Sequence, residues 1–144
     1  MTDVEERLRR LLADGRLDLP LPGGGATRER WRGLHDLAAS EELSVARLAE
    51  AHADAVAIVA EAGLALPAGD DGGPAFAGVW ASRYGGRDLF AVADGGGWRV
   101  SGELAFCSGA PMLDLALVDP ALPDGRRQLL IIPLRTDGIR VARG

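Results

Sequence analysis

Few residues in this chain combine a reactive side chain with a spacing that suits catalysis. The only imidazole and thiol groups belong to His35, His52 and Cys107. His52 falls on the apolar stripe of a predicted helix, which favours a hydrogen-bonded core histidine over a catalytic one. His35 and Asp36 are adjacent on a predicted helix and point apart, so they form no dyad. Cys107 has no histidine near it in sequence, which predicts an inert, half-buried thiol rather than a nucleophile.

Metal and phosphate sites are equally weakly indicated. The acidic residues, histidines and cysteine show no spacing typical of a metal site. A run of three glycines, Gly23 to Gly25, precedes a predicted helix start at Thr27 and superficially suggests a phosphate-binding loop. No predicted strand comes before this run, and Arg28 stands where the GxGxxG pattern needs its third glycine. We therefore expect a flexible loop.

Residues 1–65 predict three helices. Thr2 to Glu5 has the form of a capping box, and apolar residues then recur on one helical face until Gly15, a natural stop. Residues 16–26 predict a loop. A second helix is predicted from Thr27 to about Ala39, with Trp31, Leu34 and Leu37 facing inward. The third is capped by Ser40 or Ser44, ends at Gly63 and buries Val45, Leu48, Ala49, His52, Val56, Val59 and Ala60.

A linker is predicted at residues 66–75, and in the segment 76–144 the helical period gives way to alternation. Glycine-rich turns separate six predicted strands, at 76–82, 88–93, 98–106, 113–118, 128–134 and 139–142. Connections this short hold no crossover helices, so the sheet is expected to be antiparallel. Helices first and strands afterwards predict an α+β fold, with N-terminal helices followed by an antiparallel, barrel-like β domain.

Two segments of the β half match a family as well as a strand pattern. Gly102, Phe106, Cys107 and Ser108 fit a G-x-K-x-[WF]-[IC]-[TS] strand, with Leu104 in place of the lysine. Upstream, residues 78–82 (GVWAS) resemble the start of a flavin-binding loop, although Arg83-Tyr84 stands where Glu-Pro is usual. Helix-forming residues 44–55 and the later strands 112–118 and 129–134 follow in the same order. The stretch 31–141 thus resembles the front part of an acyl-CoA dehydrogenase.

The resemblance implies an FAD site that contains Ala81, Ser82, Phe106 and Ser108. An isoalloxazine ring is flat and apolar with one polar edge, so Phe106 is expected to stack on it. On a strand, Ser108 lies on the same side as Phe106 and can hydrogen-bond near the ring, as Ser82 can at the pyrimidine edge. The alternative is that Phe106 fills a β core and that both serines are turn residues.

The resemblance also implies an incomplete active site. Family members carry their catalytic carboxylate base on a C-terminal helical bundle, and no glutamate here matches it. The chain is therefore expected to be inactive alone. Three hypotheses remain open. The chain is a subunit of a split dehydrogenase acting on acyl-CoA or a related acyl thioester, a flavin- or acyl-binding module without catalysis, or a non-catalytic, interaction-only remnant or truncated product. We expect either a homo-oligomer or a complex with a chain that carries the helical half.

Composition excludes two other classes. Net charge is −5 and the arginines are scattered, so a nucleic-acid partner is not expected. Apolar runs are too short to span a bilayer, and no membrane association is expected. A single cysteine fits a reducing cytoplasm.

Overall fold

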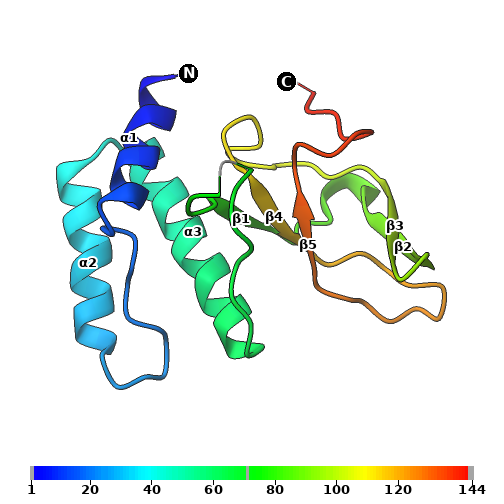
Figure 1. Cartoon of the computed structure of the whole chain (residues 1–144), viewed down its shortest axis with the longest axis horizontal. Coiled ribbons are helices and arrows are strands. Elements are labelled where there is room, and N and C mark those ends of the chain that lie inside the picture. The colour runs from blue at the N-terminus through cyan, green and yellow to red at the C-terminus, as the bar shows by residue number, and fades with distance from the viewer. Residues whose placement is uncertain (1, 71, 143–144) are drawn as a thin grey trace.

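The computed structural model describes residues 2–70 and 72–142. Within these residues, three α-helices precede five short strands, which confirms the predicted α+β class. The helices are α1 (Asp3–Ala13), α2 (Thr27–Ser40) and α3 (Leu43–Glu61). The strands are β1 (Ala77–Trp80), β2 (Leu89–Asp94), β3 (Gly97–Gly102), β4 (Leu115–Val118) and β5 (Leu130–Pro133). Figure 1 shows the helices on one side, the sheet of β1, β4 and β5 in the middle, and the β2–β3 hairpin at the far end.

Helices α1 and α3 end in the same way. The N–H of Gly15 donates to Leu12 O and the next N–H, of Arg16, donates to Leu11 O. Gly63 and Leu64 repeat this pattern at the end of α3, and both glycines have positive φ, 67° and 72°. These are Schellman caps, in which glycine accepts the left-handed conformation at little cost. Both predicted helix stops are confirmed, as is the Thr2 cap, whose Oγ1 accepts from Glu5 N.

The predicted inward face of α2 is partly wrong. Leu37 is buried, but Trp31 is 66% exposed, and the buried residue beside it is Arg30. The Arg30 guanidinium donates to Pro20 O at 3.1 Å and to Asp54 Oδ1 at 3.1 Å, which turns this side of the helix inward. Charged side chains are rarely buried unless they are paired, and the sequence does not show that Arg30 has a partner. The apolar period therefore favoured Trp31 over Arg30 as the inward residue.

Helix α3 lies between the other two helices and the sheet (Figure 1). Its predicted stripe is confirmed at Val45, Leu48, Ala49, His52 and Val59. The serine cap is wrong, because Glu42 occupies the N-cap position and makes no capping hydrogen bond through its side chain. Only Glu41 and Glu42 separate α2 from α3, and the Glu41 carboxylate instead pairs with Arg7 at 2.9 Å.

The expectation of a wholly antiparallel, barrel-like sheet is also corrected. Strand β4 lies between β1 and β5, pairing with β5 antiparallel but with β1 parallel. The crossover that a parallel pair requires is made by residues 81–114, which contain the separate β2–β3 hairpin instead of a helix. Each turn between strands is short, yet the excursion as a whole is long enough to return the chain in the same direction.

Strand lengths differ from prediction at two places. The segment predicted at 98–106 is extended only as far as Gly102, so Phe106 lies in a loop. Residues 139–142, predicted as a strand, lie in coil, and Ile139 and Val141 are exposed. The other four predicted strands each overlap an observed one, and β2 runs one residue beyond its predicted end at 93. The hairpin turn is also as predicted, because Gly95 and Gly96 both have positive φ, which a two-residue type I′ turn requires.

The core joins the helices to the sheet. One buried cluster combines residues of all three helices with Phe76 and Leu113, which flank β1 and β4. A second combines Ala55 and Val59 of α3 with Ala77, Leu115 and Leu117 of the sheet. The residues described between 66 and 75 form neither helix nor strand, and the domain limits 1–65 and 76–144 stay predictions.

Candidate functional site

Two loops of the β half carry all four residues that the sequence singled out. Ala81 and Ser82 follow β1, in a loop that contains a short 3-10 turn at Tyr84–Gly86. Phe106 and Ser108 lie in the loop between β3 and β4. Gly102, the last residue of β3, leads into this second loop with a φ of 124°. A Cβ added at Gly102 would stand 2.2 Å from Asp88 O. Only glycine fits there, so the first position of the quoted motif has a steric reason.

Side-chain contacts bring the two loops together. The Trp80 indole N–H donates to Ser108 O at 3.3 Å. The rings of Tyr84 and Phe106 meet edge to face, with centroids 4.9 Å apart and planes at 61°. Segments 80–84 and 106–108, more than twenty residues apart in sequence, are therefore neighbours in the fold. Neither Trp80 nor Tyr84 was predicted as a site residue. The one available signal for these residues was the departure from the family pattern at Arg83-Tyr84, which puts an aromatic residue in the first loop.

Phe106 has an unusual conformation. Its φ is 60°, and it is the one residue other than glycine with positive φ in the part of the chain described. A left-handed conformation at a residue with a Cβ costs roughly 1–2 kcal/mol. The Phe106 side chain is also 68% exposed. Backbone strain combined with an exposed aromatic ring is a pattern that clusters at binding sites.

The serines and Ala81 are open to solvent. Ala81, Ser82 and Ser108 are all exposed. Because β3 ends at Gly102, Phe106 and Ser108 lie outside the strand, and the prediction that they share a strand face is wrong. Ser108 instead follows a tight turn in which its N–H donates to Phe106 O at 2.9 Å. The alternative that Phe106 fills a β core is wrong as well, since its ring lies outside.

Carboxylates near these loops are ion-paired. Arg127 donates two hydrogen bonds to Asp88, at 2.7 and 2.8 Å, and one to Asp119 at 2.9 Å. The hydrogen bonds from Arg127 lower the pKa of Asp88 to about 2. Glu103 lies 3.7 Å from the Arg87 guanidinium. A carboxylate held at so low a pKa is a poor general base near neutral pH.

The buried polar groups lie elsewhere. His52 is buried, stacks on Phe76 with ring centroids 5.1 Å apart, and accepts from Ala77 N at 3.2 Å. This confirms the prediction of a hydrogen-bonded core histidine. Burial lowers the pKa of His52 to about 4, against an opposing effect of Asp18. Cys107 is half-buried as predicted, and burial raises the pKa of its thiol.

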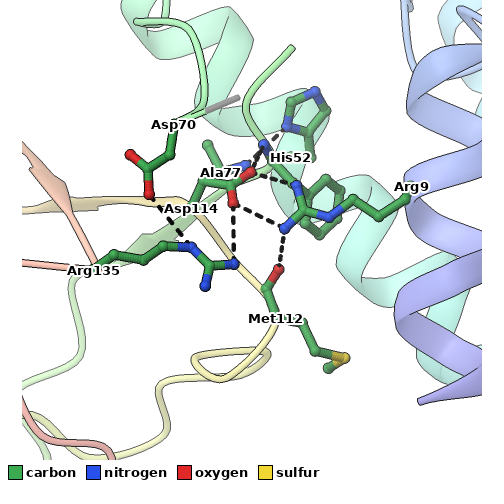
Figure 2. A network of polar contacts seen from close by, with 8 residues as sticks. Arg9, His52, Asp70, Ala77, Met112, Asp114 and Arg135 are labelled. Atoms are coloured by element: carbon green, nitrogen blue, oxygen red, sulfur yellow. Dashed lines mark hydrogen bonds and ion pairs between the residues drawn. The ribbon is translucent and has the colours of Figure 1, made fainter. Parts of the chain in front are cut away.

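A second polar network surrounds Asp114, at the start of β4 (Figure 2). Its carboxylate accepts two hydrogen bonds from Arg9 of α1, one of 2.8 Å, and one from Phe76 N at 2.8 Å. Arg135 approaches from the other side, at 3.8 Å. Burial alone raises the pKa of Asp114, but the hydrogen bonds and the two arginines outweigh burial and lower it. Asp114 was not predicted as a site residue, and its one signal in the sequence was a single aspartate within the predicted apolar strand 113–118.

Grooves of the surface lie away from the two loops. An open groove of about 600 Å³ runs between α3 and the segments 18–21 and 64–66, with mostly apolar lining. Within residues 2–70 and 72–142, no cluster of His, Cys, Asp and Glu is arranged to hold a metal ion. No helix in the same ranges has the length and apolar character needed to cross a membrane.

Comparison with protein-family models, curated proteins and solved structures finds no match to this chain.

Proposed function

We propose that this chain is the FAD-binding part of an acyl-CoA dehydrogenase-like flavoprotein. Ala81, Ser82, Phe106 and Ser108 contact the cofactor. The substrate is an acyl-CoA or a related acyl thioester, oxidised at a CH–CH bond. A partner polypeptide that carries the C-terminal helical half completes the active site. The chain forms a complex with that partner or a homo-oligomer, and the reaction belongs to the cytoplasm, where a lone thiol such as Cys107 stays reduced.

The contact between loops 80–84 and 106–108 is the observation that supports this proposal most. The family resemblance assigns both segments to one flavin site, and they lie side by side here although nothing in the strand pattern requires it. At this contact the Phe106 ring is exposed, and the Phe106 backbone has a strained, left-handed conformation.

The exposed groups fit an isoalloxazine ring. Phe106 offers an aromatic face for stacking, and the exposed Ser82 and Ser108 offer hydroxyl groups for a polar edge. Bound FAD would supply the acceptor for the hydride that leaves the substrate. The chain's own residues bind and orient the cofactor.

A partner is part of the proposal because the nearby carboxylates are already engaged. Asp88 and Asp119 are held by Arg127, and Glu103 faces Arg87. A base that removes the substrate proton must lie within hydrogen-bond reach of that proton and remain unpaired. The same observation favours, as the second candidate, a non-catalytic module that binds flavin or acyl groups.

The test is a titration of FAD with the purified chain, in which quenching of flavin fluorescence measures binding. Replacing Phe106 with Ala removes the stacking face, and we expect the Kd for FAD to rise about tenfold. Phe90→Ala is the matched control, because Phe90 is also exposed (58%) but lies on β2, outside both loops. A folded wild-type chain that leaves FAD fluorescence unchanged would contradict the proposal, as would equal loss in both variants.

A further inference from the structure

Phe106 needs neighbours that hold it in place. An exposed phenylalanine with positive φ gains little from the protein core and is free to relax unless adjacent groups restrain its backbone and ring. Two residues that the family resemblance did not assign to the cofactor make such contacts, Trp80 within the segment 78–82 and Tyr84 just after it. One acts on the backbone of its loop and the other acts on its ring.

Trp80 restrains the backbone. It lies at the end of β1, is half-buried, and packs against the core cluster that contains Phe76 and Leu113. Its indole N–H donates to Ser108 O, and Ser108 N in turn donates to Phe106 O at 2.9 Å. The indole thus connects the rigid sheet to the tight turn that includes Phe106.

Two glycines allow leucine side chains to pack closely on either side of the turn. A Cβ at Gly78 would lie 2.7 Å from Leu113 Cδ1 and 3.6 Å from the indole nitrogen of Trp80. On the other side of the turn, a Cβ at Gly109 would lie 2.7 Å from Leu48 Cδ2 of α3. The turn is therefore held between the sheet and α3 by packing that leaves no spare room.

Tyr84 restrains the ring. It is 63% exposed and contacts Phe106 edge to face, which is a favoured arrangement for two aromatic rings. Its position depends on the 3-10 turn Tyr84–Gly86, where Gly85 has a φ of 65°. Phe106 keeps most of its surface open despite this contact.

We propose that Trp80 and Tyr84 are positioning residues of the FAD site, which hold the Phe106 ring outward for stacking on the flavin. This inference rests on the proposed function. Trp80 acts through the backbone of Ser108, and Tyr84 acts through the edge of the Phe106 ring.

The test is a double-mutant cycle on FAD affinity in the full chain. Trp80→Phe keeps an aromatic ring in the core but removes the N–H donor, and Tyr84→Ala removes the ring contact from an exposed position. We expect each to raise the Kd for FAD about three- to tenfold. In a Phe106→Ala background, each should change the Kd less than twofold, because the ring that they position is gone.

A merely structural role predicts a different result. It would weaken FAD binding by the same factor with and without the Phe106 ring, and that outcome overturns the inference. Unchanged affinity in both single variants overturns it too. Thermal melting identifies any variant that fails to fold, and Tyr84→Ala tests the idea even if Trp80→Phe does not fold. Failure of the wild-type chain to bind FAD overturns the proposed function itself, so the two failures are distinguishable.

Discussion

His52 stays neutral in the folded chain because it is buried against Phe76 and accepts a hydrogen bond from Ala77 N. Burial lowers its pKa to about 4, below the ordinary value of 6.5. The unfolded chain therefore binds a proton at a higher pH than the folded chain does. The stability that depends on neutral His52 is complete above pH 6.5 and is lost as the pH falls toward 4.

We expect the free energy of unfolding to fall by about 2 kcal/mol between pH 7.5 and pH 5 on account of His52. Urea unfolding at the two pH values measures this change. In His52→Gln the amide oxygen can still accept from Ala77 N but does not titrate, so this component should disappear. His35→Gln is the control, because His35 is exposed. Its Nδ1 lies 3.2 Å from Asp36 Oδ1, so the prediction that these two neighbours point apart is wrong. Equal pH dependence in wild type and His52→Gln would show that His52 is not the group responsible.

At the residue scale, sequence patterns predicted burial better than they predicted polar partners. His52 was found from the helical period, because burial of a stripe is a local property of a helix. Arg30 and Asp114 were missed, since their burial depends on partners far away in sequence, Asp54 and Arg9. Phe106 was placed on a strand because alternation continues past Gly102, while its left-handed φ depends on tertiary contacts.

At the scale of elements, the β2–β3 hairpin is attached to the sheet by few contacts. Ala121 pairs with β2 through two backbone hydrogen bonds. Its carbonyl accepts from Ala91 N–H at 2.9 Å, and its N–H donates to Leu89 O at 2.8 Å. Arg127 adds the bidentate contact to Asp88, just before β2, and the bond to Asp119, just after β4. Because Asp88 has a pKa of about 2, lowered first by the Arg127 hydrogen bonds, this contact persists through mildly acidic pH.

Replacing Arg127 with Leu should loosen the hairpin without unfolding the chain. We expect amide hydrogen exchange at Ala91 and Ala121 to speed up about tenfold, with little change in α3, because sub-global opening exposes only the weakly attached unit. Arg126→Leu is the matched control, since Arg126 pairs only locally with Asp124. Uniformly faster exchange across α3 as well would mean that Arg127 supports the whole fold instead.

Helices were predicted more accurately than sheet pairing for a physical reason. Helix limits depend on nearby residues such as Thr2, Gly15 and Gly63, whose hydrogen bonds stay within a few positions. Pairing of β1 with β4 depends on where a long excursion returns, which no local pattern states. Residues 139–142 have strand-forming composition, but a strand also requires a neighbour, and composition does not report one.

At the scale of the whole molecule, the chain leaves many large apolar residues exposed. They are Leu21, Trp31, Leu43, Leu64, Tyr84, Phe90, Val92, Trp98, Phe106, Leu129, Ile139 and Val141. The free edge of β5 is a weaker contact site than its sequence implies. Leu134 N–H donates to Asp114 O, next to β4. Successive residues of a strand direct their backbone N–H and C=O groups to opposite sides, so the backbone of Pro133 faces the free edge. Pro133 has no N–H with which to bind another strand there. On α3, Leu48 is covered by the chain's own core, as its place on the predicted buried stripe implies.

We expect the purified chain to have a mass above that of a monomer in light scattering, because exposed apolar side chains favour association. Trp31, displaced outward by Arg30, is the largest of these residues on the helices. Trp31→Ser should shift the mass toward that of the monomer, and Arg32→Ser is the neighbouring control. A stable wild-type monomer at micromolar concentration would contradict this expectation and the split-subunit hypothesis.

The parallel pairing of β1 with β4 also sets the order in which the chain can fold during its synthesis. The helices and β1 are made first, but Leu113, Leu115 and Leu117 complete both buried clusters only when residues 113–118 emerge. Until then β1, the strand that packs against α3, lacks its partner strand β4, and closing the intervening loop costs entropy before any strand contact is gained. A nascent chain arrested at residue 112 should therefore be cut rapidly by protease, whereas one extended past β5 should resist.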